Sequence, residues 1–149
     1  MNGNKLVKIL NVTLPVAGIG LVYYYKICDT LCAYISGSFM GVDLMYIGIL
    51  FMAALLMLNI PVAASYRKPM DHLRTMMLSG AMGGEVILLR FQVVNETFCP
   101  YCLAFGFCLL LLFAIHFRGM NKYLAAASFL AGIGIFALFF QGSVLPLYR

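Results

Sequence analysis

The stretch NETFCPYCLAFGFCLLLLFAIHF, residues 95–117, changes from polar to almost continuously apolar within a few residues. From Cys99 to Phe117 it contains no Asp, Glu, Lys or Arg. Its length is close to the ~20 residues that a helix needs to cross the hydrocarbon core of a bilayer. The stretch therefore predicts a membrane-spanning helix that begins at a pair of cysteines.

Similar apolar runs occur throughout the chain. Together with residues 99–117 they cover about 6–25, 44–65, 75–94 and 124–140, and polar or turn-rich segments separate them. Composition agrees, because 64% of the 149 residues are hydrophobic and only 10% are charged, unlike a typical water-soluble domain. We expect an all-α membrane protein whose single transmembrane domain, residues 1–149, is a four-helix bundle plus a fifth transmembrane helix.

The basic residues predict the orientation of these spans. Most of the ten Lys and Arg residues lie at the amino terminus, in the second loop and in the fourth loop, which all fall on one side. Short loops rich in Lys and Arg stay cytoplasmic. We therefore expect the N-terminus inside and the C-terminus outside, and we interpret the net charge of +5 as a topology signal. No nucleic-acid partner is expected, since no basic stripe lies on a soluble face.

The five cysteines fall into a pattern on this topology. Cys28 and Cys32 lie in the first outer loop, and Cys99 and Cys102 lie at the second outer loop. Both pairs therefore meet a non-cytoplasmic face, where disulfides persist. Cys108, about two turns into the fourth span, is interpreted as a small apolar core residue.

The Cys-Pro-Tyr-Cys motif at residues 99–102 predicts redox chemistry. Pro100 fits the first position of a helix, where a missing N–H has no cost. The positive end of the helix dipole favours a thiolate, and the three-residue spacing allows the two sulfurs to bridge. The motif thus indicates reversible dithiol–disulfide conversion, with a static bridge as the alternative. A soluble glutaredoxin-type site is excluded by the apolar span that follows.

The other pair, Cys28 and Cys32, is separated by three residues. On a rigid helix such positions hold their Cβ atoms about 5–6 Å apart, which is too far for a disulfide, so we expect a turn or a mobile loop. A mobile pair would relay electrons by thiol exchange. A structural loop disulfide is the alternative, and a zinc site built from all four thiolates is less favoured at an oxidising face.

With these features the chain resembles the vitamin K epoxide reductase family of membrane thiol oxidoreductases. The likeness covers the first four spans: an outer loop with two cysteines, CAYISGSFMGVDLMYIGI from Cys32, and FCPYCL at the start of the fourth helix. In that family a Ser and a Gly follow the second loop cysteine by six and nine residues, as Ser38 and Gly41 do here. Gly106 stands where the animal enzymes carry a Tyr.

The resemblance implies a four-helix bundle around a quinone, with the fifth span accessory. By the same resemblance, Cys102 faces the quinone and Cys99 is its partner. Cys32 would attack Cys99, and Cys28 would exchange with a thioredoxin-like protein. Ser38 would hydrogen-bond the quinone or help to close its pocket.

We therefore expect an enzyme, a quinone-dependent thiol oxidoreductase of a bacterial plasma membrane with its active site facing the periplasm or exterior. It would pass electrons from a separate thioredoxin-like partner to ubiquinone or menaquinone and so support disulfide formation, because no thioredoxin-like domain follows the fifth span. The alternatives are a non-catalytic small membrane protein with two structural outer disulfides and a metal-binding membrane protein. Glu85, near the middle of the third span, would either deliver protons or bond a neighbouring helix as a neutral carboxyl.

Overall fold

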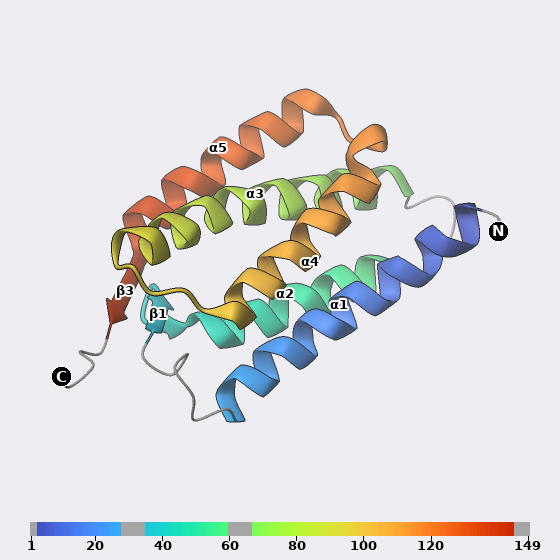
Figure 1. Ribbon diagram of the computed structural model, residues 1–149. Coiled ribbons are helices and arrows are strands. Elements are labelled where there is room, and N and C mark those ends of the chain that lie inside the picture. The colour runs from blue at the N-terminus through green and yellow to red at the C-terminus, as the bar shows by residue number, and fades with distance from the viewer. Residues whose placement is uncertain (1–2, 28–34, 60–66, 145–149) are drawn as a thin grey trace.

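The computed structural model describes residues 3–27, 35–59 and 67–144 as a bundle of helices with a small sheet at one end (Figure 1). The helices are α1 (Gly3–Ile27), α2 (Leu44–Asn59), α3 (Arg67–Val94), α4 (Pro100–His116), the short 3₁₀ helix η3 (Phe117–Gly119) and α5 (Lys122–Phe139). The strands are β1 (Ile35–Phe39), β2 (Val42–Asp43) and β3 (Phe140–Val144).

Four helices in the described part of the chain are long and apolar enough to cross a membrane: α1, α3, α4 with η3, and α5. The membrane prediction is confirmed at this level, by length and composition. Helix α2 is also apolar, but its 16 residues fall short of the ~20 that a full crossing needs. The end of the second expected run, residues 60–65, lies outside the described residues. Large side chains on the outer faces stay exposed, as lipid contact requires; Leu50 is 73% exposed and Leu138 is 79% exposed.

The helices form two groups. Helices α3 and α5 lie side by side in the most extensive helix–helix contact, whereas α1 packs on α2 and α4. Helix α4 also contacts α3 and so connects the two groups. The core between them is apolar and is built from Met52, Leu55, Leu78, Leu109, Leu112 and Met120. This arrangement leaves space between the groups near the sheet, where the candidate site lies.

Small residues allow α3 and α5 to approach closely. A Cβ atom on Gly83 would collide with the backbone oxygen of Phe129, and one on Gly132 would collide with the backbone oxygen of Gly80. The sequence has small residues four apart on the third span, at Ser79 and Gly83 and at Gly80 and Gly84. This spacing predicts a close helix neighbour. The prediction is confirmed, and the neighbour is α5.

The three-stranded sheet corrects the expectation of an all-α chain. Strand β1 pairs antiparallel with β2 across a two-residue turn, and with β3 along its other edge. The turn residues Met40 and Gly41 have φ of 52° and 80°, the left-handed pair that a tight hairpin with right-handed twist needs. Helix α5 ends at Phe139, close to the end of the fifth apolar run, and the residues that follow pair with β1 as β3.

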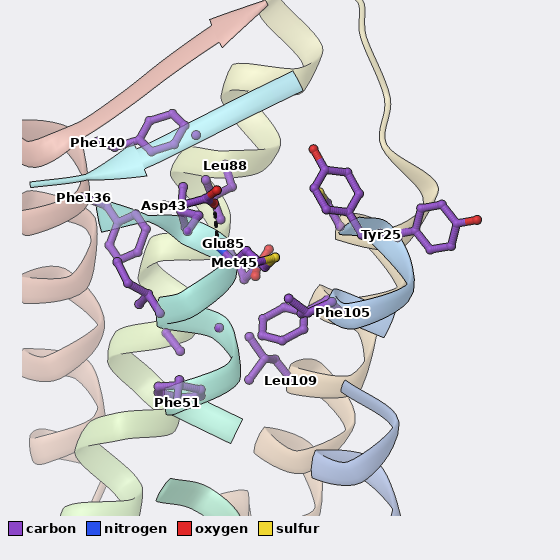
Figure 2. Close-up of a pocket in the computed structure, with 18 of the residues that line it drawn as sticks. Tyr25, Asp43, Met45, Phe51, Glu85, Leu88, Phe105, Leu109, Phe136 and Phe140 are labelled. Carbon is purple, nitrogen blue, oxygen red and sulfur yellow. Dashed lines mark hydrogen bonds between the residues drawn. The ribbon is translucent and has the colours of Figure 1, made fainter. Parts of the chain in front are cut away.

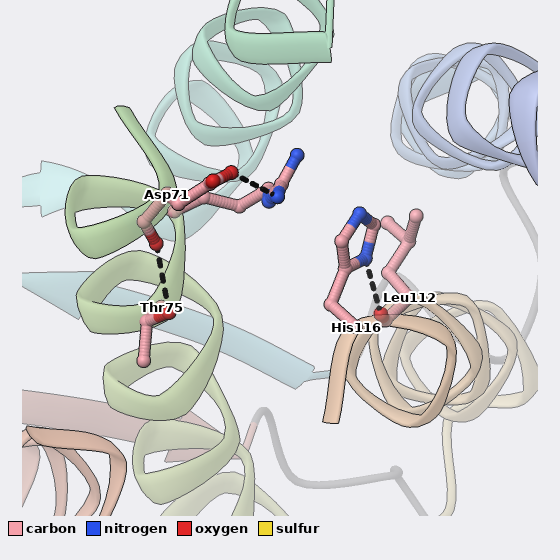
Figure 3. A network of polar contacts seen from close by, with 5 residues as sticks. Asp71, Thr75, Leu112 and His116 are labelled. Carbon is pink, nitrogen blue, oxygen red and sulfur yellow. Dashed lines mark hydrogen bonds and ion pairs between the residues drawn. The ribbon is translucent and has the colours of Figure 1, made fainter. Parts of the chain in front are cut away.

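The opposite end of the bundle carries local polar contacts (Figure 3). Arg74 pairs with Asp71, the Thr75 hydroxyl donates to the Asp71 carbonyl oxygen at 2.8 Å, and Nδ1 of His116 lies 2.9 Å from the Leu112 carbonyl oxygen. His116 ends α4, so the ~25 Å length of this helix separates these groups from the cysteines at its start.

Candidate functional site

The Cys-Pro-Tyr-Cys motif forms the first turn of α4, as the sequence predicts. Cys99 is the N-cap residue with an extended backbone, and Pro100 occupies the first helical position. The Cys102 N–H donates to the Cys99 Sγ at 3.4 Å, and the Leu103 N–H donates to the Cys99 carbonyl oxygen at 3.0 Å. The Cys99 sulfur therefore lies where helix N–H groups stabilise negative charge.

Cys99 is completely buried. Its side chain packs among Tyr25, Phe91, Tyr101 and Cys102, and the rings of Tyr25 and Tyr101 stand edge to face with centroids 6.4 Å apart. The Oε1 atom of Gln92, itself 4% exposed, accepts the Cys99 N–H at 3.0 Å. Gln92 thus pairs a buried N–H that the helix cannot satisfy, while the aromatic rings separate the Cys99 sulfur from solvent.

A cavity of about 320 Å³ lies between the two helix groups, directly beside this motif (Figure 2). All five α-helices contribute to its walls, and β1 and β3 close the end near the sheet. Cys102, Phe105 and Leu109 line it from α4, and Phe51 and Phe136 line it from α2 and α5. The walls are mostly apolar, and the volume falls within the range of small-molecule sites.

Few polar side chains reach the cavity, and two of them are carboxyl groups. Asp43 accepts the Met45 N–H at 2.9 Å, a contact that begins α2 (Figure 2). Glu85 from α3 is 9% exposed and borders the cavity. No hydrogen bond to its carboxyl group is found within the described residues. The tyrosines Tyr25 and Tyr101 also line the cavity, at the end nearest the Cys-Pro-Tyr-Cys motif.

The predicted site residues have different positions. Cys99 and Cys102 lie together, with Cys102 on the cavity wall. Ser38 lies in β1, where its hydroxyl donates to the Gln141 carbonyl oxygen at 3.5 Å; it is not among the lining residues, although its neighbours Ser36 and Gly37 are. Cys28 and Cys32 lie outside the described residues. Cys108 is buried within α4, which confirms its assignment to the core.

Two residues of the site are not identified by the sequence pattern. Gln92 attracts attention only as an uncharged polar residue inside an apolar run, seven positions before Cys99. Tyr25 belongs to a run of three tyrosines that is typical of a membrane interface. Tyr23 and Tyr24 are indeed exposed, at 63% and 56%, whereas Tyr25 turns inward to the cavity. Successive residues of a helix point in different directions, so the three tyrosines of α1 do not share one environment.

No protein-family model matches the sequence, and no curated protein matches it. The geometry of the cysteines and of the cavity is therefore the basis for a functional proposal.

Proposed function

We propose that the protein is a membrane thiol:quinone oxidoreductase of the vitamin K epoxide reductase type. One observation carries the proposal: Cys102, the second cysteine of a helix-capping Cys-Pro-Tyr-Cys motif, lies on the wall of a mostly apolar cavity inside the bundle. A redox-active sulfur beside an apolar cavity is suited to an electron acceptor that dissolves in lipid.

The cavity residues fit a quinone. Phe51, Phe105 and Phe136 offer aromatic faces to a flat ring. The walls include a small number of polar groups that fix orientation, as small-molecule sites usually do. When bound, a quinone supplies the capacity to accept two electrons and two protons. Whether it is ubiquinone or menaquinone, the same residues would hold it.

The side chains of this protein would perform the thiol chemistry. Cys99 and Cys102 release two electrons and two protons as their S–S bond forms, and the N-terminus of α4 stabilises the thiolate that reacts first. The aromatic cluster around Cys99 excludes water from this step. Cys32 would reduce the Cys99–Cys102 bond by thiol exchange, and Cys28 would accept electrons from a thioredoxin-like partner.

The orientation in the membrane follows from the basic residues. Lys5 and Lys8 lie at the start of α1, Lys68 at the start of α3, and Arg118 and Lys122 at the connection between α4 and α5. Figure 1 shows all three places at the end of the bundle opposite the sheet. We propose that this end is cytoplasmic, that α2 also spans the membrane, and that the cysteines face the periplasm or exterior of a bacterial plasma membrane.

The test is reconstitution of the purified protein with a reduced thioredoxin-like protein and a soluble quinone analogue. We expect quinone reduction coupled to oxidation of the partner thiols. Replacing Cys102 by Ala removes the sulfur beside the cavity, and we expect the rate to fall roughly 100-fold or more. Cys108→Ala is the matched control, because Cys108 lies in the same helix but in the core.

Two outcomes would count against the proposal. One is a wild-type protein that folds and does not reduce any quinone. The other is a Cys102→Ala protein as active as the Cys108→Ala control. Loss of thermal stability in all Cys→Ser variants, with no turnover in the parent, would favour the non-catalytic alternative with structural disulfides.

A further inference from the structure

Glu85 is a carboxyl group in the interior of a spanning helix. It lies in α3 about two and a half turns before the helix ends. The side chain is 9% exposed, and it borders the cavity that Cys102 also lines. A carboxyl group in such a place is costly unless it is protonated or bonded to a partner. Since no hydrogen bond to it is found in the described part of the chain, a ligand in the cavity is the natural partner.

Gly106 makes room for this carboxyl group. A Cβ atom at position 106 would lie 3.0 Å from Oε2 and 3.4 Å from the carboxyl carbon of Glu85. The carboxyl group therefore rests against the backbone of α4 at Gly106. Even the methyl group of Ala at this position would require the Glu85 carboxyl group to shift by a few tenths of an ångström.

The contact at Gly106 also fixes where the carboxyl group lies relative to the reactive cysteine. Gly106 follows Cys102 by four residues, so the two share one face of α4. They are about 6 Å apart along the helix axis. Cys102 and Glu85 thus border the same cavity, and the Glu85 carboxyl group contacts α4 one helical turn after Cys102.

We propose that Glu85, in its protonated form, hydrogen-bonds a carbonyl oxygen of the quinone and transfers a proton to it. This inference rests on the proposed function. Electrons and protons balance in this step. The Cys99–Cys102 dithiol loses two electrons and two protons as its S–S bond forms, and reduction of the quinone to a quinol takes up the same two electrons and two protons. Glu85 donates its proton to the quinone and takes up a proton from the thiol pair, so its carboxyl group is protonated again at the end of the step.

Asp43 is the other carboxyl group on the cavity wall, and it is a poorer candidate. Its Oδ1 is engaged by the Met45 N–H at the start of α2, and the residue is exposed. Among the described lining residues, Glu85 is therefore the acid available to a ligand. The class of ligand this selects is a flat ring with carbonyl oxygens rather than a purely hydrocarbon lipid.

The first experiment needs no turnover. The full-length protein, with its cysteines oxidised, is titrated with a short-chain benzoquinone while infrared difference spectra are recorded. We expect the C=O band of a protonated carboxyl group to shift when the quinone binds, and to be missing in Glu85→Gln. Glu96→Gln is the matched control, because Glu96 is an exposed carboxyl residue in the turn before α4 and should leave the band in place.

The second experiment compares turnover. For Glu85→Gln we expect kcat to fall about 100-fold, with KM for the quinone changing much less, because a positioned acid contributes 10²–10⁴-fold to such steps. Glu85→Asp keeps the acid and should recover part of the rate. If quinone binding causes no change in the carboxyl C=O band of the wild-type protein, the inference is overturned. This outcome can be measured even if Glu85→Gln fails to fold.

The two proposals fail in different ways. If the wild-type protein reduces quinone but Glu85→Gln stays within about threefold of its kcat, the role of Glu85 is wrong and the oxidoreductase proposal stands. If the wild type shows no quinone reduction at all, the oxidoreductase proposal itself falls.

Discussion

At the scale of single residues, the start of α4 depends on an uncharged side chain of the preceding helix. Gln92 accepts the buried N–H of Cys99 and holds the N-cap residue against α3. The intervening turn is tight: Thr97 N–H donates to the Gln92 carbonyl oxygen at 3.0 Å, and Glu96 has a φ of 50°. Through these two contacts, Gln92 fixes the position of Cys99 relative to the end of α3.

We predict that Gln92→Leu lowers the free energy of unfolding by about 1–3 kcal/mol, because the Cys99 N–H would be left buried without an acceptor. Thermal unfolding in detergent measures the loss. Gln141→Leu is the matched control; its side chain is exposed on β3, so the change should stay within about 0.5 kcal/mol. Equal stability of the two variants would show that the Gln92 contact does not hold the N-cap.

At the scale of elements, the contact between α3 and α5 depends on backbone meeting backbone. Gly132 lies against the carbonyl group of Gly80, so no side-chain movement can relieve a clash there. Close backbone packing of this kind replaces the hydrophobic driving force that lipid removes. The pair in turn positions Phe136 and Glu85 on the cavity wall.

We predict that Gly132→Ala destabilises the protein by about 1–3 kcal/mol through overpacking. Gly134→Ala, two residues along the same helix, meets no atom within 4 Å of the added Cβ. It should be neutral or stabilising by up to ~1 kcal/mol, because Ala is the better helix former. Denaturant titration of both variants tests this contrast, and a reversed order of stabilities would contradict the packing.

At the scale of the whole molecule, most of the basic residues and the Cys-Pro-Tyr-Cys motif lie at opposite ends of the bundle. Cys99 and Cys102 share their end with the sheet and with Lys26 in the last turn of α1. The mostly apolar cavity lies inside the bundle, near the end that carries the cysteines. Under the proposed function, this arrangement would connect thiols in water to an acceptor in the membrane.

We predict that a cysteine placed at residue 95 reacts with an impermeant thiol reagent in intact cells, whereas one placed at residue 119 reacts only after lysis. Asn95 and Gly119 are both exposed, at the end of α3 and in η3 respectively. Labelling is measured as the increase over the parent protein, which retains its own cysteines. The reverse pattern would invert the topology and place Cys99 and Cys102 on the cytosolic side.

The local features of this protein are determined by the sequence alone. Apolar runs of bilayer length predict five spans, because hydrophobic length is a property of a continuous segment, and four of them are helices long and apolar enough to cross a membrane. Pro100 likewise predicts the start of α4, because the preference of proline for the first helical position depends only on one turn of helix. The small residues of α3 predict a close neighbour but not that the neighbour is α5.

The site itself is decided by tertiary structure. Strand β3 forms only because β1 offers it an edge from a hundred residues earlier in the chain, and Ser38 is consequently bonded to β3. The cavity exists because two helix groups pack without filling the space between them, and this brings Glu85 against Gly106. Such contacts depend on the relative placement of separate helices, which no periodicity within one helix encodes.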